Sequence, residues 1–137
     1  MKILDSQNGK IQKGGEMSET KQVPYDLRER TFQFSVRVIK WVRLLPRDMG
    51  TQIAAKQLIE SATSVGANVE EADGADTAKD RVYKWTISRK EGRESRYWIR
   101  VIRAASADSP EAAALEQESI ELVKILSTLI NKGKQAL

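Results

Sequence analysis

The sequence predicts an all-α protein, an antiparallel up-down-up-down four-helix bundle preceded by a disordered N-terminal leader. Residues 25–137 contain four amphipathic segments with helical periodicity, and short loops containing Pro, Gly or Asp separate them. No segment in this range reads as a strand. Short connections favour antiparallel neighbours, and a chain of 137 residues is long enough for one domain with one core.

Residues 1–24 mix Gly, Lys, Gln and Ser without helical or strand periodicity, and we interpret them as a flexible leader. Met17 lies inside this leader, which leaves Met1 and Met17 as two candidate start sites. The bundle itself is expected to span residues 25–137.

The first helix is predicted over residues 26–45. Asp26 and Glu29 have the spacing of a capping box, and Pro46 ends the helix because the residue before a proline avoids the α region. The residues expected to face the core are Leu27, Phe34, Val38, Trp41 and Leu45.

The second helix is predicted over residues 51–74, with Thr51 as its N-cap. Gly66 lies in its interior among other small residues, which indicates that another helix approaches closely there. The inward residues are expected to be Leu58, Ala62, Val65, Val69 and Ala72, with Ala55 and Ile59 beside them.

The third and fourth helices are predicted over residues 78–105 and 110–132. Ser109-Pro110-Glu111 is a strong helix start, and Gly133 between two lysines is typical of a helix end. The core stripe of the fourth helix is expected to be Leu115, Leu122, Val123, Leu126, Leu129 and Ile130.

Winding residues 78–105 as a helix separates two opposite faces. The face expected to point inward carries Tyr83, Ile87, Glu91, Glu94, Trp98, Val101, Ile102 and Ala105. The opposite face carries a stripe of arginines, namely Arg89, Arg93, Arg96, Arg100 and Arg103. Trp85 lies at the edge of this stripe, beside Arg81 and Arg89.

The arginine stripe predicts a surface that follows a phosphate backbone, with Trp85 as a stacking platform for bases. Residues 77–106 hold nine Lys or Arg against three acidic residues. Arg37, Lys40 and Arg47 of the first helix and its loop are expected to contribute. The alternative is a solvated face whose arginines pair with acids of another subunit or of the second helix, namely Glu60, Glu70, Glu71 and Asp73.

Two further features concern assembly and the interior. Phe32, Val36 and Ile39 form a second apolar row on the first helix, away from its core face, which predicts a homo-oligomer interface. Glu91 and Glu94 on the expected inward face favour a polar layer with a row on the second helix, consisting of Ser61, Ser64 and Asn68.

The composition excludes many functions. The chain has no Cys and no His, which removes disulfides, thiolate catalysis, Cys/His zinc sites and Ser-His-Asp triads. An all-carboxylate metal site or an enzyme built on Glu91 and Glu94 remains a weak alternative, because no nucleophile or phosphate-binding loop accompanies them. We expect no catalysis, no metal and no cofactor. No apolar run suits a membrane span or a signal peptide, which favours a cytoplasmic protein that does not bind membranes.

Two motifs resemble those of a known family. The pattern Ser61-x-x-Ser64-x-x-x-Asn68, followed by Lys90-Glu91-x-x-Glu94-x-x-Tyr97-Trp98, is similar to that of the 23S rRNA intervening-sequence proteins, over residues 25–135. The resemblance implies an antiparallel four-helix bundle that assembles as a ring, typically a homopentamer, without established enzymatic activity. In some bacteria such proteins are encoded within insertions in large-subunit ribosomal RNA genes.

This family is also similar to the accessory protein of diversity-generating retroelements, a basic pentameric barrel that binds a reverse transcriptase and its RNA. The resemblance therefore implies RNA or a nucleoprotein as partner. The chain departs from the family pattern at Arg81, Trp85 and Arg89, which replace apolar residues, and at Gly92. We predict a non-enzymatic homo-oligomeric bundle that binds RNA or a nucleoprotein, and the alternative is an oligomeric interaction scaffold without nucleic-acid contact.

Overall fold

A computed structural model of the protein describes residues 25–137. These residues form four helices and no strand: α1 (Tyr25–Val42), α2 (Met49–Asp73), α3 (Ala78–Ala105) and α4 (Pro110–Gln135). The predicted leader, including Met17, lies outside the described residues. Among the four helices of this part of the chain, none has the length and apolar character that crossing a bilayer requires.

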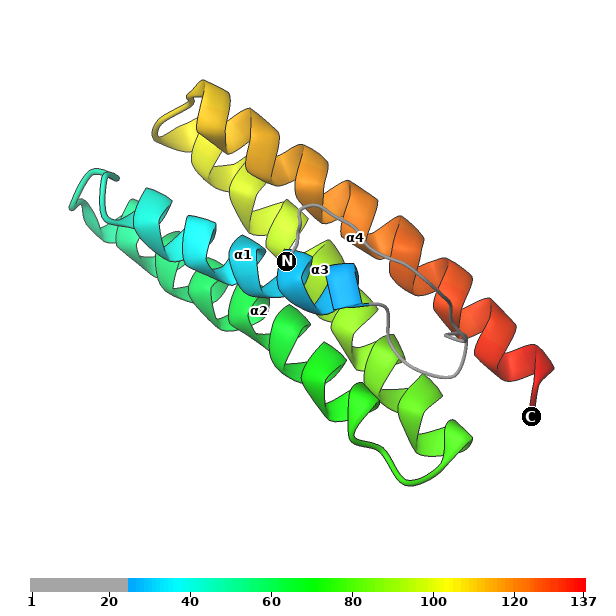
Figure 1. Ribbon diagram of the computed structural model, residues 1–137. Helices are drawn as coiled ribbons and strands as arrows, with labels where there is room; N and C mark the ends of the chain where they lie inside the picture. The colour runs from blue at the N-terminus through cyan, green and yellow to red at the C-terminus, as the bar shows by residue number, and fades with distance from the viewer. Residues whose placement is uncertain (1–24) are drawn as a thin grey trace.

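Neighbouring helices are antiparallel, as the sequence predicted. On the α1–α2 boundary, Arg28 pairs with Glu70, whereas Ser35, further along α1, bonds to the earlier residue Ala62 of α2. The contacts Val65–Ser88 and Ser61–Ser95 show the same opposed order for α2 and α3. Arg89–Ser127 and Arg96–Glu116 show it for α3 and α4. Arg30–Glu118 and Arg37–Glu111 show it for α1 and α4. The backbones of α1 and α3 do not come close to each other, and the two helices lie diagonally across the bundle (Figure 1).

The core faces of α1, α2 and α4 are as predicted. All five expected core residues of α1 are buried, as are the five of the main α2 row together with Ala55. On α4, Leu115, Leu122, Leu126 and Ile130 are buried, while Val123 and Leu129 are half-buried at its flanks. Spacing at three and four residues was sufficient here because apolar residues recur along each of these faces. On α1 the same spacing also gives the second row, Phe32, Val36 and Ile39, which is exposed or half-buried.

The helix ends differ from the prediction in three places. Helix α1 ends at Val42, and the next residues form tighter turns in which Leu44 and Leu45 donate to the carbonyls of Trp41 and Val42. Asp48 rather than Thr51 caps α2, because its carboxylate accepts the Thr51 backbone N–H at 3.0 Å. Helix α4 continues past Gly133 to Gln135. The bounds of α3 agree with the prediction.

The predicted inward face of α3 is wrong for most of its residues, and of the eight only Ile102 is buried. The buried row runs through Val82, Trp85, Ser88, Gly92, Ser95, Ile99 and Ile102. Tyr83, expected inside, is 59% exposed, and Glu91, Glu94 and Trp98 are only half-buried. The true core direction lies roughly 120° from the predicted one. The aromatic residues Tyr83 and Trp98 suggested the wrong face, because the middle of the buried row consists of the small residues Ser88, Gly92 and Ser95.

Small residues let the helices approach closely at two seams. On the α1–α2 seam, a Cβ at Gly66 would lie 3.3 Å from the Thr31 carbonyl oxygen, which confirms the predicted close approach. On the α2–α3 seam, Ser88 donates to the Val65 carbonyl at 2.8 Å, and Ser95 donates to Ser61 Oγ at 2.9 Å. These contacts satisfy buried hydroxyls without large side chains between the helices.

Candidate nucleic-acid interface

The arginine stripe of α3 faces α4, and two of its members pair with acids there. Arg103 contacts Asp108 and Glu116, both at 2.8 Å, and Arg96 reaches the same Glu116 at 3.4 Å. The hydrogen bond to Asp108, followed by that to Glu116, raises the pKa of Arg103 above its usual value. The acids of α2 proposed as alternative partners form no ion pair with the stripe within residues 25–137: Glu70 and Asp73 pair with Arg28 of α1, and Glu60 pairs with Lys56.

Two stripe arginines, Arg93 and Arg100, are exposed and have no ion-pair partner within residues 25–137. Arg89 is half-buried and makes one long contact, 3.4 Å, with Ser127 of α4. The stripe therefore divides into members bound by α4 and members that remain available to an anion.

Both available arginines line a groove of about 320 Å³ between α3 and α4, which we call the α3–α4 groove. Its lining residues are Arg93, Arg96, Tyr97, Arg100, Ser119, Ile120, Val123 and Lys124. Tyr97 is 55% exposed and brings an aromatic ring to the groove, a residue that the sequence analysis did not select for this surface. The signal that could have identified it is its spacing, four residues after Arg93 and three before Arg100.

Trp85 cannot serve as the predicted stacking platform. Its side chain is buried, with 7% of the residue exposed, and its ring packs beside Gly133 of α4, where an added Cβ would lie 3.4 Å from it. Arg81 is half-buried near Trp85, in a different hollow from the α3–α4 groove. Trp85 faces α4 rather than solvent because the buried face of α3 is rotated from the predicted one.

The basic residues of α1 do not extend this groove. Arg37 binds Glu111 of α4 through two bonds of 3.1 and 3.2 Å, whereas Arg96 binds Glu116. Glu111 and Glu116 are five positions apart and therefore lie roughly 140° apart around α4. Arg37 and Arg96 thus approach α4 from different sides. Lys40 follows Arg37 on α1, and Arg47 is exposed in the loop after α1. The expected continuous surface is therefore interrupted by α4.

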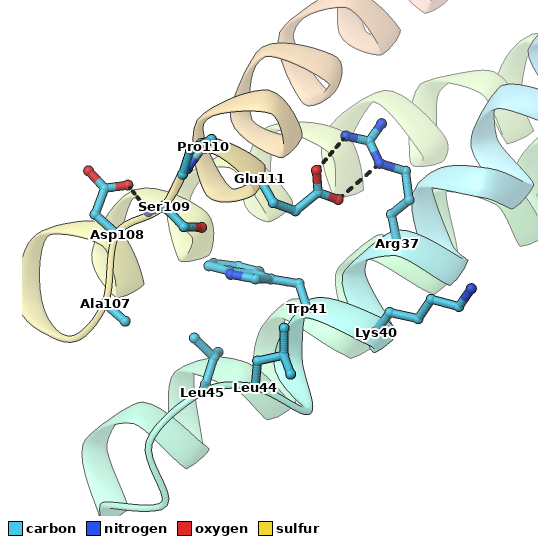
Figure 2. A pocket seen from close by; sticks show the side chains of 10 residues that line it. All are labelled: Arg37, Lys40, Trp41, Leu44, Leu45, Ala107, Asp108, Ser109, Pro110 and Glu111. Atoms are coloured by element: carbon cyan, nitrogen blue, oxygen red, sulfur yellow. Dashed lines mark hydrogen bonds and ion pairs between the residues drawn. The ribbon is translucent and has the colours of Figure 1, made fainter.

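Arg37 and Lys40 instead border a separate cavity of about 500 Å³ at the end of the bundle. Figure 2 shows the Trp41 ring between the end of α1 and the Ala107–Glu111 segment, with the Arg37–Glu111 pair across one side. Lys40 extends away from the ring. Because Glu111 already neutralises Arg37, this cavity presents mainly apolar side chains rather than a cationic surface.

Comparison with known proteins identifies the family. Residues 25–128 match the sequence pattern of the 23S rRNA-intervening sequence proteins. The chain belongs to that family. Among solved structures, its fold is similar to a protein of unknown function from the S23 ribosomal protein family of Bacteroides thetaiotaomicron, with a TM-score of 0.70 and 27% identity; the match covers 76% of this chain and 97% of the other. No curated protein matches this chain.

In this 23S rRNA-intervening sequence protein, the predicted polar layer has different members. Ser61 bonds to Ser95, Asn68 bonds back to Ser64 within α2, and Glu94 accepts the Trp98 indole N–H at 3.3 Å. Burial, and then the charge of Glu94, raises the pKa of Glu91 above its usual value. Within residues 25–137, no group of three or more acidic side chains could hold a metal ion.

The predicted oligomer row of this family member is partly solvent-accessible. Phe32 is 57% exposed, whereas Val36 and Ile39 are half-buried beside it on α1. The exposed Phe32 is available for contact with a second subunit, and the interface stays a prediction because the structure describes one chain.

Proposed function

We propose that this 23S rRNA-intervening sequence protein is a non-enzymatic homo-oligomer that binds RNA, alone or within a nucleoprotein, through the α3–α4 groove. The observation that supports RNA binding is the pair of exposed arginines without ion-pair partners, Arg93 and Arg100, on either side of Tyr97 in one groove. Guanidinium groups bind phosphate oxygens in bidentate fashion. The family name itself refers to intervening sequences of ribosomal RNA.

The charges of the groove set the expected strength of binding. Arg93 and Arg100 are available to phosphates, while Arg96 and Lys124 each already contact a glutamate, at 3.4 and 3.8 Å. We therefore expect about two phosphate contacts per subunit and a slope of log affinity against log salt of about −1.4 for a single strand. An oligomer multiplies such sites, and binding is expected to show little sequence preference.

Charge reversal tests the proposal. Arg93→Glu with Arg100→Glu should abolish RNA retention at low salt while leaving the circular dichroism spectrum unchanged, because both side chains are exposed. Lys40→Glu with Arg47→Glu is the matched control, since it makes the same change in net charge away from the groove and should retain binding. Equal loss of binding in both double variants would contradict the assignment to this groove.

The second candidate is an oligomeric protein-interaction scaffold without nucleic-acid contact. The pairing of Arg96 and Arg103 with α4 acids favours it, because those arginines stabilise the bundle itself. A purified protein without absorbance of nucleic acid at 260 nm, and with no shift of RNA at low salt, would support the scaffold and contradict RNA binding.

A further inference from the structure

Tyr97 lies between two cations on the exposed surface of α3. Arg93 and Arg100 lie four residues before it and three after it, so the three side chains share one face of α3. The Tyr97 ring meets the Trp98 ring edge to face, with centroids 5.0 Å apart and planes at 77°. Trp98 in turn donates its indole N–H to Glu94. The contact between the two rings limits the motion of an otherwise exposed tyrosine.

This inference rests on the proposed function and specifies its ligand. We infer that the α3–α4 groove binds single-stranded RNA in preference to duplex RNA, with an unpaired base stacked on Tyr97 and adjacent phosphates on Arg93 and Arg100.

The chemistry of the groove suits an unpaired base. An exposed aromatic ring offers a stacking face to any base, and Arg side chains beside it bind the backbone without reading sequence. The opposite side of the groove includes Ile120 and Val123 of α4, against which the other face of the base can pack. A base within a duplex is already stacked on both faces and cannot use Tyr97 without leaving the helix.

The position of α3 in the bundle disfavours duplex RNA. Helix α3 packs against α2 on one side and α4 on the other, and hence cannot enter a groove of a duplex as an isolated recognition helix does. The major groove of duplex RNA is also deep and narrow. Arg93 and Arg100, separated by about 10 Å along α3, instead provide two points that a flexible strand can follow.

The test compares two RNAs on the full-length protein by fluorescence anisotropy. An oligouridine of about 12 nucleotides should bind about tenfold more tightly than a duplex of the same length. Tyr97→Ala should weaken oligouridine binding by about tenfold, while Tyr97→Phe, which keeps the ring, should remain within about twofold. Tyr83→Ala is the matched control, because Tyr83 is an equally exposed tyrosine of α3, at 59%, outside the groove.

The salt dependence separates stacking from charge. Tyr97→Ala should leave the slope of log affinity against log salt unchanged, whereas Arg100→Gln should reduce its magnitude by about 0.7. Duplex binding as tight as strand binding, or unchanged strand binding in Tyr97→Ala, would overturn this inference. In either of those cases, loss of RNA binding in the Arg93→Glu, Arg100→Glu variant would leave the proposed function standing. A wild-type protein that bound neither RNA would overturn both the proposed function and this inference.

Discussion

Ser95 of α3 donates a hydrogen bond to the Oγ of Ser61 of α2 over 2.9 Å, and both side chains are buried. Ser95 Oγ also lies 2.8 Å from the Glu91 carbonyl, and Ser61 Oγ lies 3.2 Å from the Leu58 carbonyl. Every buried hydroxyl at this point therefore has a partner. The rotation of α3 that brings Ser95 to this contact also buries Ile99 and Ile102, and it decides which of its arginines face α4 and which face solvent.

A double-mutant cycle should measure this contact. Ser95→Ala should lower the free energy of unfolding by about 1 kcal/mol, because one buried hydrogen bond is lost. The double variant Ser61→Ala, Ser95→Ala should lose about 0.5 kcal/mol less free energy of unfolding than the sum of the two single variants, because no hydroxyl is left without its partner. Urea unfolding measures all four proteins, and strictly additive values would show that the two serines act independently.

Neutralising Glu116 should strengthen RNA binding if the groove binds phosphate. Glu116 holds both Arg96 and Arg103, but Arg103 keeps its ion pair with Asp108, so Glu116→Gln releases Arg96 to the groove. Each additional phosphate contact should steepen the salt slope by about 0.7 for a single strand. Glu111→Gln is the control, because it releases Arg37 on a different side of α4. Equal gains in the two variants, measured by anisotropy at several salt concentrations, would indicate a general charge effect.

Glu91→Gln should raise stability at neutral pH by roughly a few tenths of a kcal/mol, a small effect because the side chain is partly solvated. Burial and the neighbouring Glu94 raise the pKa of Glu91 in the folded protein above 4.5, its value in the unfolded chain. The folded state thus binds this proton more tightly, and the associated stability is lost as the pH rises through the raised pKa.

The gain from Glu91→Gln should therefore disappear when the pH falls below about 4.5, where Glu91 is protonated in both states. Thermal unfolding at a series of pH values measures it. In a Glu94→Gln background the gain at neutral pH should be smaller, because one source of the raised pKa is gone. A gain that does not change with pH would mean that packing, rather than charge, limits stability at this position.

Phe32→Asp should dissociate the oligomer if the row Phe32, Val36 and Ile39 forms its interface. Phe32 is exposed in the isolated subunit, so the substitution should not unfold the bundle, but a charge within an apolar contact is costly. Light scattering after gel filtration should report the mass of one subunit. Leu44→Asp, at an apolar residue that is 82% exposed outside this row, should keep the wild-type mass. A wild-type protein that is already monomeric would contradict the predicted interface.

A face of large apolar residues could be predicted from the sequence, whereas a face of small residues could not. On α1, α2 and α4, large apolar residues such as Phe34, Leu58 and Leu122 recur at helical spacing, and all three are buried. On α3, Ser88, Gly92 and Ser95 form the buried centre, while Tyr83 remains exposed. A hydrophobic pattern cannot detect a face built for close approach, because its residues are small or polar.

The candidate site was predicted in part. The position of Arg93, Arg96 and Arg100 on one face followed from helical periodicity alone. Their partners could not be predicted, since Glu116 and Asp108 come from the following helix and loop. Trp85 and Tyr97 could not be assigned correctly either, because packing against the other helices sets the rotation of α3. This rotation buries Trp85 and leaves Tyr97 exposed.

The sequence by itself determined the number of helices, most of their ends, their antiparallel order and three of the four core faces, because these depend on local caps, prolines and the spacing of large apolar residues. Only the tertiary structure decided the rotation of α3, and with it the division of the arginines between α4 and solvent. That rotation is set by contacts such as Ser95–Ser61 between residues 34 positions apart, whose energy depends on how closely two helix backbones can pack.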